Sequence, residues 1–289
     1  MPRTTLALTS FVSGEFSPKM EGRTDFEKYS SGAKTLENFL VHPQGAATRR
    51  VGTQFIGEVK SSSAKTRLIP FEFSTTQTYV LEFGNNYIRF FKDKGQILSG
   101  GNPYEISSPY LTAELFDIKF AQSADVMYVT HPNHEVMKLS RTGHTSWSLT
   151  EVDFIDGPYL PTNNTATTLT PASAGVGTGV NITASAVTGI NGGAGFQTTD
   201  VGRFISFNSG IAKITSRTNT TVVVCTITTA FTDTSAKTDW KLGAFSDTTG
   251  HPSCVSFFEQ RLVFAGTTDE PQTLFFSKAG DYENMTTGT

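Results

Sequence analysis

The chain has 289 residues and a formal net charge of −3; charged residues make up 17% of it and 23 residues are Phe. Such a chain is too apolar for a disordered tail and is long enough for one large domain or two modest domains. The acidic balance disfavours a protein that grips nucleic acid through phosphate contacts, because such proteins carry a basic excess or cluster, and only Arg49 and Arg50 are adjacent basic residues here.

The first 60 residues are polar and extended, and we expect them to form an N-terminal arm held by contacts outside a compact domain, to neighbouring subunits or to an adjoining ring of another protein. One helix is predicted in the arm, over residues 25–40, because apolar side chains recur there every three or four positions. The start of the chain lacks the apolar core of a signal peptide, and no run approaches the roughly 18 apolar residues of a membrane helix. We therefore expect assembly in the cytoplasm.

Three later stretches share one pattern: an apolar run, a polar turn, a second apolar run and a closing Gly. They are Phe71–Gly95, Ile118–Gly143 and Val255–Gly280, so each Gly falls 24 or 25 residues after the first apolar residue. The first two stretches begin 47 residues apart, within the period of about 40 to 50 residues of propeller blades. Ordinary hairpins of a β-rich chain are the alternative explanation of this spacing.

The segment of residues 161–246 differs in composition, with 20 Thr, no Glu and eight charged residues. Its short alternating runs predict a small β subdomain inserted between the second and third repeat units. Removing these 86 residues from the 137 that separate the starts of those units leaves 51, close to the first interval. Insertion at a loop adds little loop-closure cost.

The predicted fold is therefore mainly β. It consists of the arm with its one helix (1–60), two blade-like units (61–160), the inserted Thr-rich β subdomain (161–246) and a third blade-like unit (247–289). Three blades are fewer than the four to eight, approximately, that close a propeller, so we expect an incomplete propeller-like platform of antiparallel sheets whose chain ends before ring closure.

Signatures of metal binding and of reactive thiols are weak. His131 and His134 flank a Pro-Asn pair that predicts a hairpin turn, and no Cys or third His stands nearby, so no metal site is expected. Cys225 and Cys254 lie in apolar, strand-like runs and are expected to be small buried hydrophobes.

Catalytic signatures are equally weak. Asp153 and Asp156 precede a Gly-Pro pair and are interpreted as turn residues, with paired acid/base carboxylates as the alternative. The repeated turn of propeller sialidases has its nearest match at residues 140–147, where Thr142 and His144 replace the diagnostic Asp and Gly. We expect no enzyme and no cofactor.

Both ends of the chain carry ordered short motifs. The N-terminal stretch contains a Gly-x-x-Ser-Pro element, a Gly-Arg-x-Asp turn, a predicted helix ending in Asn and an Arg-Arg-x-Gly-Thr run. These residues are Gly14, Ser17, Pro18, Gly22, Arg23, Asp25, Asn38, Arg49, Arg50, Gly52 and Thr53. The C-terminal stretch contains Pro-Ser, Arg-Leu and Ser-x-x-x-x-Tyr-x-Asn elements. These residues are Pro252, Ser253, Arg261, Leu262, Ser277, Tyr282 and Asn284.

In this order the motifs resemble those of the tail nozzle proteins, also called tail tubular protein B, of short-tailed bacteriophages. The resemblance implies a structural virion protein in the phage tail: a homohexameric ring that docks on the portal adaptor protein, contacts tail fibres and forms the channel through which genomic DNA leaves, with no small-molecule substrate. It implies assembly in the host bacterial cytoplasm. Family members continue beyond the Tyr-x-Asn element, so we expect this chain to be a short or split version, or a part, of a nozzle protein.

The alternative is a receptor- or glycan-binding β module of a virion or cell surface. The Thr-rich loops of the insert favour it, and Trp147 and Trp240 could stack on a sugar, although packing in a core is the favoured use of both rings. A glycosidase of propeller fold ranks last, because no set of carboxylates recurs with the repeat units.

Overall fold

A computed structural model describes residues 7–286 of the chain. The first six residues of the predicted arm and the last three of the third blade-like unit lie outside the described residues. The described part is mainly β, as predicted, with its strands in seven sheets. No helix in it has the length and apolarity needed to cross a membrane. The chain divides into two compact units, Met1–Phe55 and Ile56–Thr289.

The first unit contains only very short elements. Its strands are β1 (Gly14–Glu15), β2 (Gly32–Ala33), β3 (Phe39–Val41) and β4 (Ala47–Arg49), and its 3₁₀ helices are Pro18–Met20 and Glu27–Ser31. Strand β1 pairs with β2 in parallel, and β3 pairs with β4 in an antiparallel hairpin.

The prediction of a helix over residues 25–40 is wrong. Only the 3₁₀ turn Glu27–Ser31 forms, and the backbone becomes extended at Gly32, with φ −122° and ψ 172°. A short helix in water depends on packing of its apolar face, and the only buried residues among 7–55 are Gly32 and Gly45. Gly in a helix interior also costs about 1 kcal/mol relative to Ala.

The second unit begins with two antiparallel sheets. The first sheet has the order β11-β7-β6-β5, with β8 paired to β7, and a small hairpin joins β9 to β10. These strands are β5 (Arg67–Ser74), β6 (Gln77–Gly84), β7 (Tyr87–Lys92), β8 (Gly95–Gln96), β9 (Leu98–Ser99), β10 (Asn102–Pro103) and β11 (Glu105–Ser107). The second sheet is a meander of β12 (Lys119–Ser123), β13 (Val126–His131), β14 (His134–Gly143) and β15 (Ser146–Glu151).

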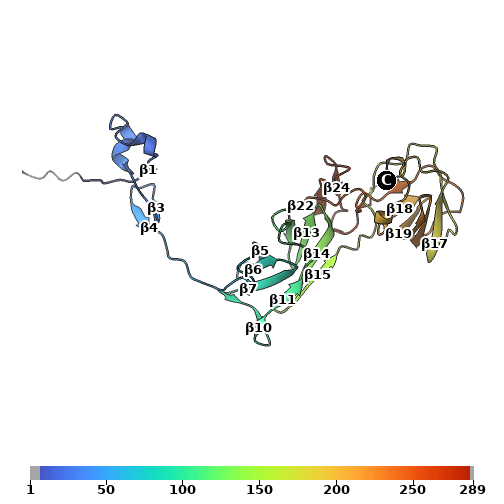
Figure 1. Cartoon of the computed structure of the whole chain (residues 1–289), viewed down its shortest axis with the longest axis horizontal. Helices are drawn as coiled ribbons and strands as arrows, with labels where there is room; N and C mark the ends of the chain where they lie inside the picture. Colours follow the sequence, from blue (N-terminus) through green and yellow to red (C-terminus); the bar gives the residue numbers. More distant parts are fainter. Residues whose placement is uncertain (1–6, 287–289) are drawn as a thin grey trace, which may run out of the picture. The chain divides into compact units, whose positions relative to one another are not determined.

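Two further sheets follow (Figure 1). The first has the order β16-β17-β20-β19-β18-β21 and lies within residues 161–246. Its strands are β16 (Leu169–Pro171), β17 (Gly177–Ala184), β18 (Phe204–Phe207), β19 (Gly210–Asn219), β20 (Val222–Thr229) and β21 (Lys241–Leu242), and its 3₁₀ helices are Asn191–Gly193 and Thr198–Asp200. The last sheet is a meander of β22 (Cys254–Phe258), β23 (Arg261–Ala265) and β24 (Leu274–Phe276).

Each repeat unit is built on a three-stranded antiparallel meander, not on the two apolar runs that the pattern indicates. Strands β5, β6 and β7 form the first meander, β12, β13 and β14 the second, and β22, β23 and β24 the third. These three meanders form no closed ring of blades within residues 7–286.

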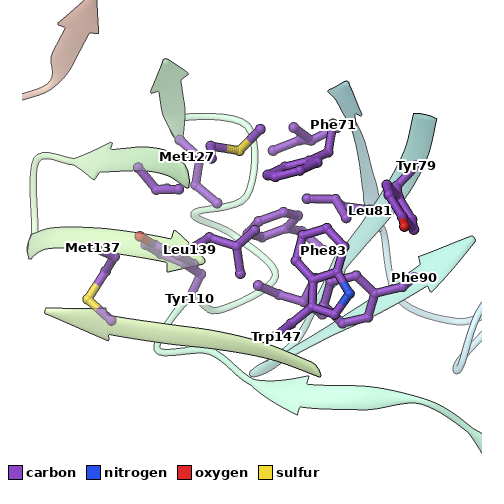
Figure 2. Packing of buried hydrophobic residues seen from close by; sticks show 14 of the residues in the cluster. Phe71, Tyr79, Leu81, Phe83, Phe90, Tyr110, Met127, Met137, Leu139 and Trp147 are labelled. Carbon is purple, nitrogen blue, oxygen red and sulfur yellow. The ribbon is translucent and has the colours of Figure 1, made fainter. Parts of the chain in front are cut away.

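The central strands of the second sheet, β13 and β14, contribute buried side chains to both faces, because side chains alternate between the faces of a strand. Met127 and Val129 of β13 join a core shared with the first sheet, whereas Tyr128 between them joins a core shared with the β22–β24 sheet. Figure 2 shows the first core. In this core the Trp147 ring packs edge-on against the Phe71 ring, and their centroids are 4.8 Å apart. The three meanders are thus joined in series through the two faces of the second.

The sheet within residues 161–246 has its own core, which includes Trp240 and Cys225. The two ends of this segment lie side by side: Leu160 N donates to Leu242 O at 2.8 Å, and Ala244 N donates to Pro158 O at 2.7 Å. The chain therefore leaves and re-enters the surrounding structure at one place.

Candidate functional site

The first unit exposes large apolar side chains, and within its described residues 7–55 no apolar side chain is buried. Val51 is 84% exposed and Phe55 is 77% exposed. The other exposed large apolar residues of this unit are Leu8, Val12, Phe26, Phe39, Leu40 and Val41. Eight large apolar side chains are thus exposed within residues 7–55, and exposed apolar surface that forms a patch marks a site of interaction. We call these eight residues the apolar arm residues.

Two predicted motif residues of this unit form a clamp across the β3–β4 hairpin. Asn38 Oδ1 accepts a hydrogen bond from Arg50 Nε at 2.6 Å, and Asn38 O accepts one from Arg50 N at 2.9 Å. Asn38 has φ +62°, a left-handed conformation that Asn tolerates better than most residues. The clamp joins the residues that flank the hairpin.

The other N-terminal motif residues act locally. Arg23 donates to both Asp25 oxygens, at 2.8 and 2.7 Å, and this hydrogen bonding lowers the pKa of the exposed Asp25 carboxyl. Ser17 Oγ caps the first 3₁₀ helix, which begins at Pro18. Gly14 and Gly22 have positive φ. Arg49, Gly52 and Thr53 are exposed and join no cluster among the described residues.

Three of the C-terminal motif residues meet at the β22–β24 sheet. Ser277 is fully buried: its N donates to Leu262 O, and its Oγ accepts from Leu262 N, both at 2.8 Å. Arg261 Nη1 donates to Ser277 O, also at 2.8 Å. Ser277 therefore continues the pairing with β23 after β24 has ended.

The remaining C-terminal motif residues link this sheet to its surroundings. The Tyr282 ring packs edge-on against Phe257 with centroids 5.0 Å apart, and Asn284 forms a bridge with Asp156. Pro252 is buried, and Ser253 N donates to Gly266 O at 3.2 Å. The C-terminal motif residues thus form hydrogen bonds within the β22–β24 sheet and contacts between this sheet and the segments that flank it.

The structure separates the two aspartates considered for acid/base chemistry. Asp156 accepts hydrogen bonds from Tyr159 Oη at 2.5 Å and from Thr286 Oγ1 at 2.6 Å, whereas exposed Asp153 pairs with Lys213 Nζ at 3.0 Å. Burial, followed by the hydrogen bond to Asp156, raises the pKa of Tyr159. Asp156 therefore has a structural role.

Another carboxylate pair, Glu135 and Glu151, lines a cleft together with Lys213 and His251. Burial is the main cause that raises the pKa of Glu135, and the neighbouring Glu151 adds to it. No spacing rule in the sequence joins these two residues. They meet because β14 pairs with β15.

The side chains of Glu114, His131 and His134 each offer a ligand atom within 4.8 Å of the other two. Glu114 Oε2 accepts from Leu111 N at 2.8 Å and lies 2.9 Å from His134 Nε2. Burial alone would raise the pKa of Glu114, but these two hydrogen bonds lower it. Sequence reasoning paired the two histidines and missed Glu114, which lies 17 residues before His131 in a different loop.

The expected burial is found for both tryptophans and for one of the two cysteines. Trp147 and Trp240 are buried, as favoured, so neither ring offers its face to a sugar. Cys225 is buried as expected, and its burial raises the pKa of the thiol to about 12. The expectation for Cys254 is wrong, because this residue lies on the exposed face of the edge strand β22.

Comparison with known proteins finds no matching family model and no curated protein of significant sequence similarity.

Proposed function

We propose that this chain is a structural virion protein of a short-tailed bacteriophage, a tail nozzle subunit that assembles into a homohexameric ring on the portal adaptor protein, contacts tail fibres and encloses the channel for DNA ejection. The observation that carries the proposal is the exposure of the apolar arm residues. The ordered motifs at both ends of the chain, which resemble those of tail nozzle proteins, support the choice of this family.

The apolar arm residues favour a neighbouring subunit as their covering surface. Burying apolar surface contributes about 25 cal/mol per Å², and residues 7–55 contain no apolar core that could provide this burial internally. Its hairpin is nevertheless held in shape by the Asn38–Arg50 clamp. A segment with a fixed hairpin and exposed apolar side chains is suited to docking on the preformed surface of another subunit.

We also propose that the three meanders form an incomplete propeller-like platform and that residues 161–246 form an inserted β subdomain. The burial of both faces of the second sheet supports the first point, because successive blades of a propeller pack face to face. The separate core of residues 161–246 and the adjacent ends of this segment support the second.

The net charge of −3 supports a passive channel for DNA, since a wall without basic clusters adds little phosphate attraction as the duplex passes. Contact between the ring and DNA is then non-specific.

The test is the mass of the native particle, measured by native mass spectrometry. The wild-type chain is expected to form a closed ring. The double variant Val51→Asp, Phe55→Asp is expected to remain folded by circular dichroism but to be monomeric. The matched control Gln54→Ala changes an exposed polar residue of the same segment and should still form rings. A monomeric wild-type chain, or rings in the double variant, would contradict the proposal.

A further inference from the structure

Three metal-ligand side chains converge at the junction between the first and second sheets. His131 is the last residue of β13, His134 is the first residue of β14, and Glu114 lies in the segment that connects β11 to β12. The hairpin turn and the connecting segment therefore meet at this cluster.

One member of the cluster is a buried group with an unused polar atom. The His131 side chain is 1% exposed, and its Nε2 has no hydrogen-bond partner among the described residues. The fully buried Tyr110 hydroxyl beside it likewise has none, and the Tyr110 ring centroid lies 6.0 Å from that of His131 and 5.2 Å from that of His134. Buried polar atoms without partners are rare and call for an explanation.

The donor set is one that zinc uses, since two imidazoles and one carboxylate hold zinc in several proteins, with water in the fourth position. The 2.9 Å between Glu114 Oε2 and His134 Nε2 is a few tenths short of the separation of about 3.3 Å between neighbouring ligands in a tetrahedron with bonds of about 2.0–2.1 Å. We propose that Glu114, His131 and His134 bind one zinc ion, which fastens the segment before β12 to the β13–β14 turn.

Zinc binding at this cluster requires no release of protons to solvent. His131 Nδ1 accepts a hydrogen bond from Asn133 N at 3.1 Å, so the neutral ring carries its proton on Nε2. Zinc binding through Nε2 moves this proton to Nδ1 and exchanges the Asn133 hydrogen bond for a metal bond. His134 undergoes the same shift, because its Nε2 releases the hydrogen bond to Glu114. The carboxylate stays ionised.

This site revises the expectation from sequence that His131 and His134 are turn residues alone. It does not depend on the nozzle role, because any protein with this junction would be stabilised by a ligand that binds only the folded state.

The test uses full-length, metal-free protein titrated with zinc chloride by calorimetry, and with cobalt(II) by visible absorption. We expect one zinc per chain and the intense bands of tetrahedral cobalt. The variants Glu114→Gln and His134→Asn should each weaken zinc affinity by at least about tenfold, the lower bound for loss of even an outer-shell partner. His42→Ala, which removes an exposed histidine of the first unit, should leave zinc binding unchanged.

Circular dichroism of each metal-free variant establishes that it is folded before titration. Glu114→Gln retains an oxygen that can accept from Leu111 N, so this variant is the one most certain to fold. The proposal is overturned if wild-type protein binds no zinc, if cobalt gives only the weak bands of an octahedral ion, or if both cluster variants bind zinc as tightly as wild type.

Discussion

Asp200 and Arg203 form an ion pair in which both side chains are fully buried, with Asp200 Oδ1 2.9 Å from Arg203 Nη1. Arg203 also donates to Asn191 Oδ1 at 2.7 Å and to Gly243 O, while Asp200 Oδ2 accepts from Gln197 N at 2.7 Å. Burial lowers the pKa of Arg203, and the nearby Asp200 opposes this effect. Arg203, the residue before β18, thus contacts Gly243, the residue after β21.

Removing one charge of this pair should strongly destabilise the protein. Asp200→Asn leaves the Arg203 charge buried without a counter-ion, which costs about 3–5 kcal/mol in comparable pairs. The control Asp153→Asn breaks the Lys213 pair, in which the Asp153 side chain is 88% exposed, and should cost less than about 1 kcal/mol. Urea unfolding measures the stability of both variants. Similar losses of unfolding free energy would show that the buried pair contributes no more to stability than the exposed one.

The Glu135–Glu151 pair should make stability depend on pH. Because the folded-state pKa of Glu135 is raised above its ordinary value, the folded protein binds more protons than the unfolded chain, and stability falls as pH rises through this interval. Asp247 contributes in the same direction as Glu151, and Lys213 opposes both.

Glu151→Gln should therefore stabilise the protein at pH 7, by less than about 1 kcal/mol because Glu135 is exposed to solvent. The gain should disappear as pH falls below the ordinary Glu pKa of about 4.3, where Glu135 is protonated in the folded and the unfolded chain alike. Chemical unfolding at several pH values measures it, with Glu259→Gln, at an exposed turn, as the control. A gain that persists at low pH would assign the effect to something other than charge.

The Asn38–Arg50 clamp should control the order of the arm hairpin without affecting the second unit. Asn38→Ala removes the Oδ1 acceptor and places Ala in a left-handed conformation, which costs about 1–2 kcal/mol. We expect the Arg50 amide, which donates to Asn38 O, to exchange its hydrogen several-fold faster. Amides of β6 and β13 should be unchanged, and faster exchange there would place the effect outside the arm.

The assembled protein should not bind duplex DNA measurably at physiological salt. A lining that made six to ten phosphate contacts would lose about three to five decades of affinity between roughly 50 and 200 mM salt. Filter binding at several salt concentrations tests this. Sub-micromolar affinity at about 150 mM salt with a steep salt slope would indicate a ring of basic residues, one from each subunit, and would contradict the passive channel.

The sequence by itself determined the mainly β character and the burial of both tryptophans. Strand formation follows from local alternation and turn residues, and large aromatic rings in apolar runs such as the one around Trp147 have few alternatives to a core. These signals are contained within about ten residues, so they are readable without knowing what packs on them.

Tertiary structure decided the rest. The apolar periodicity of residues 25–40 predicted a helix, but no core lies against it and the chain is extended from Gly32. Cys254 resembles a core residue in its local sequence but lies on the uncovered face of β22, whereas Val255 and Phe257 on the other face pack against a core. Glu114 joins His131 and His134 only because a connecting segment meets a hairpin turn. Such contacts depend on which elements pack together, and packing joins residues that no local pattern relates.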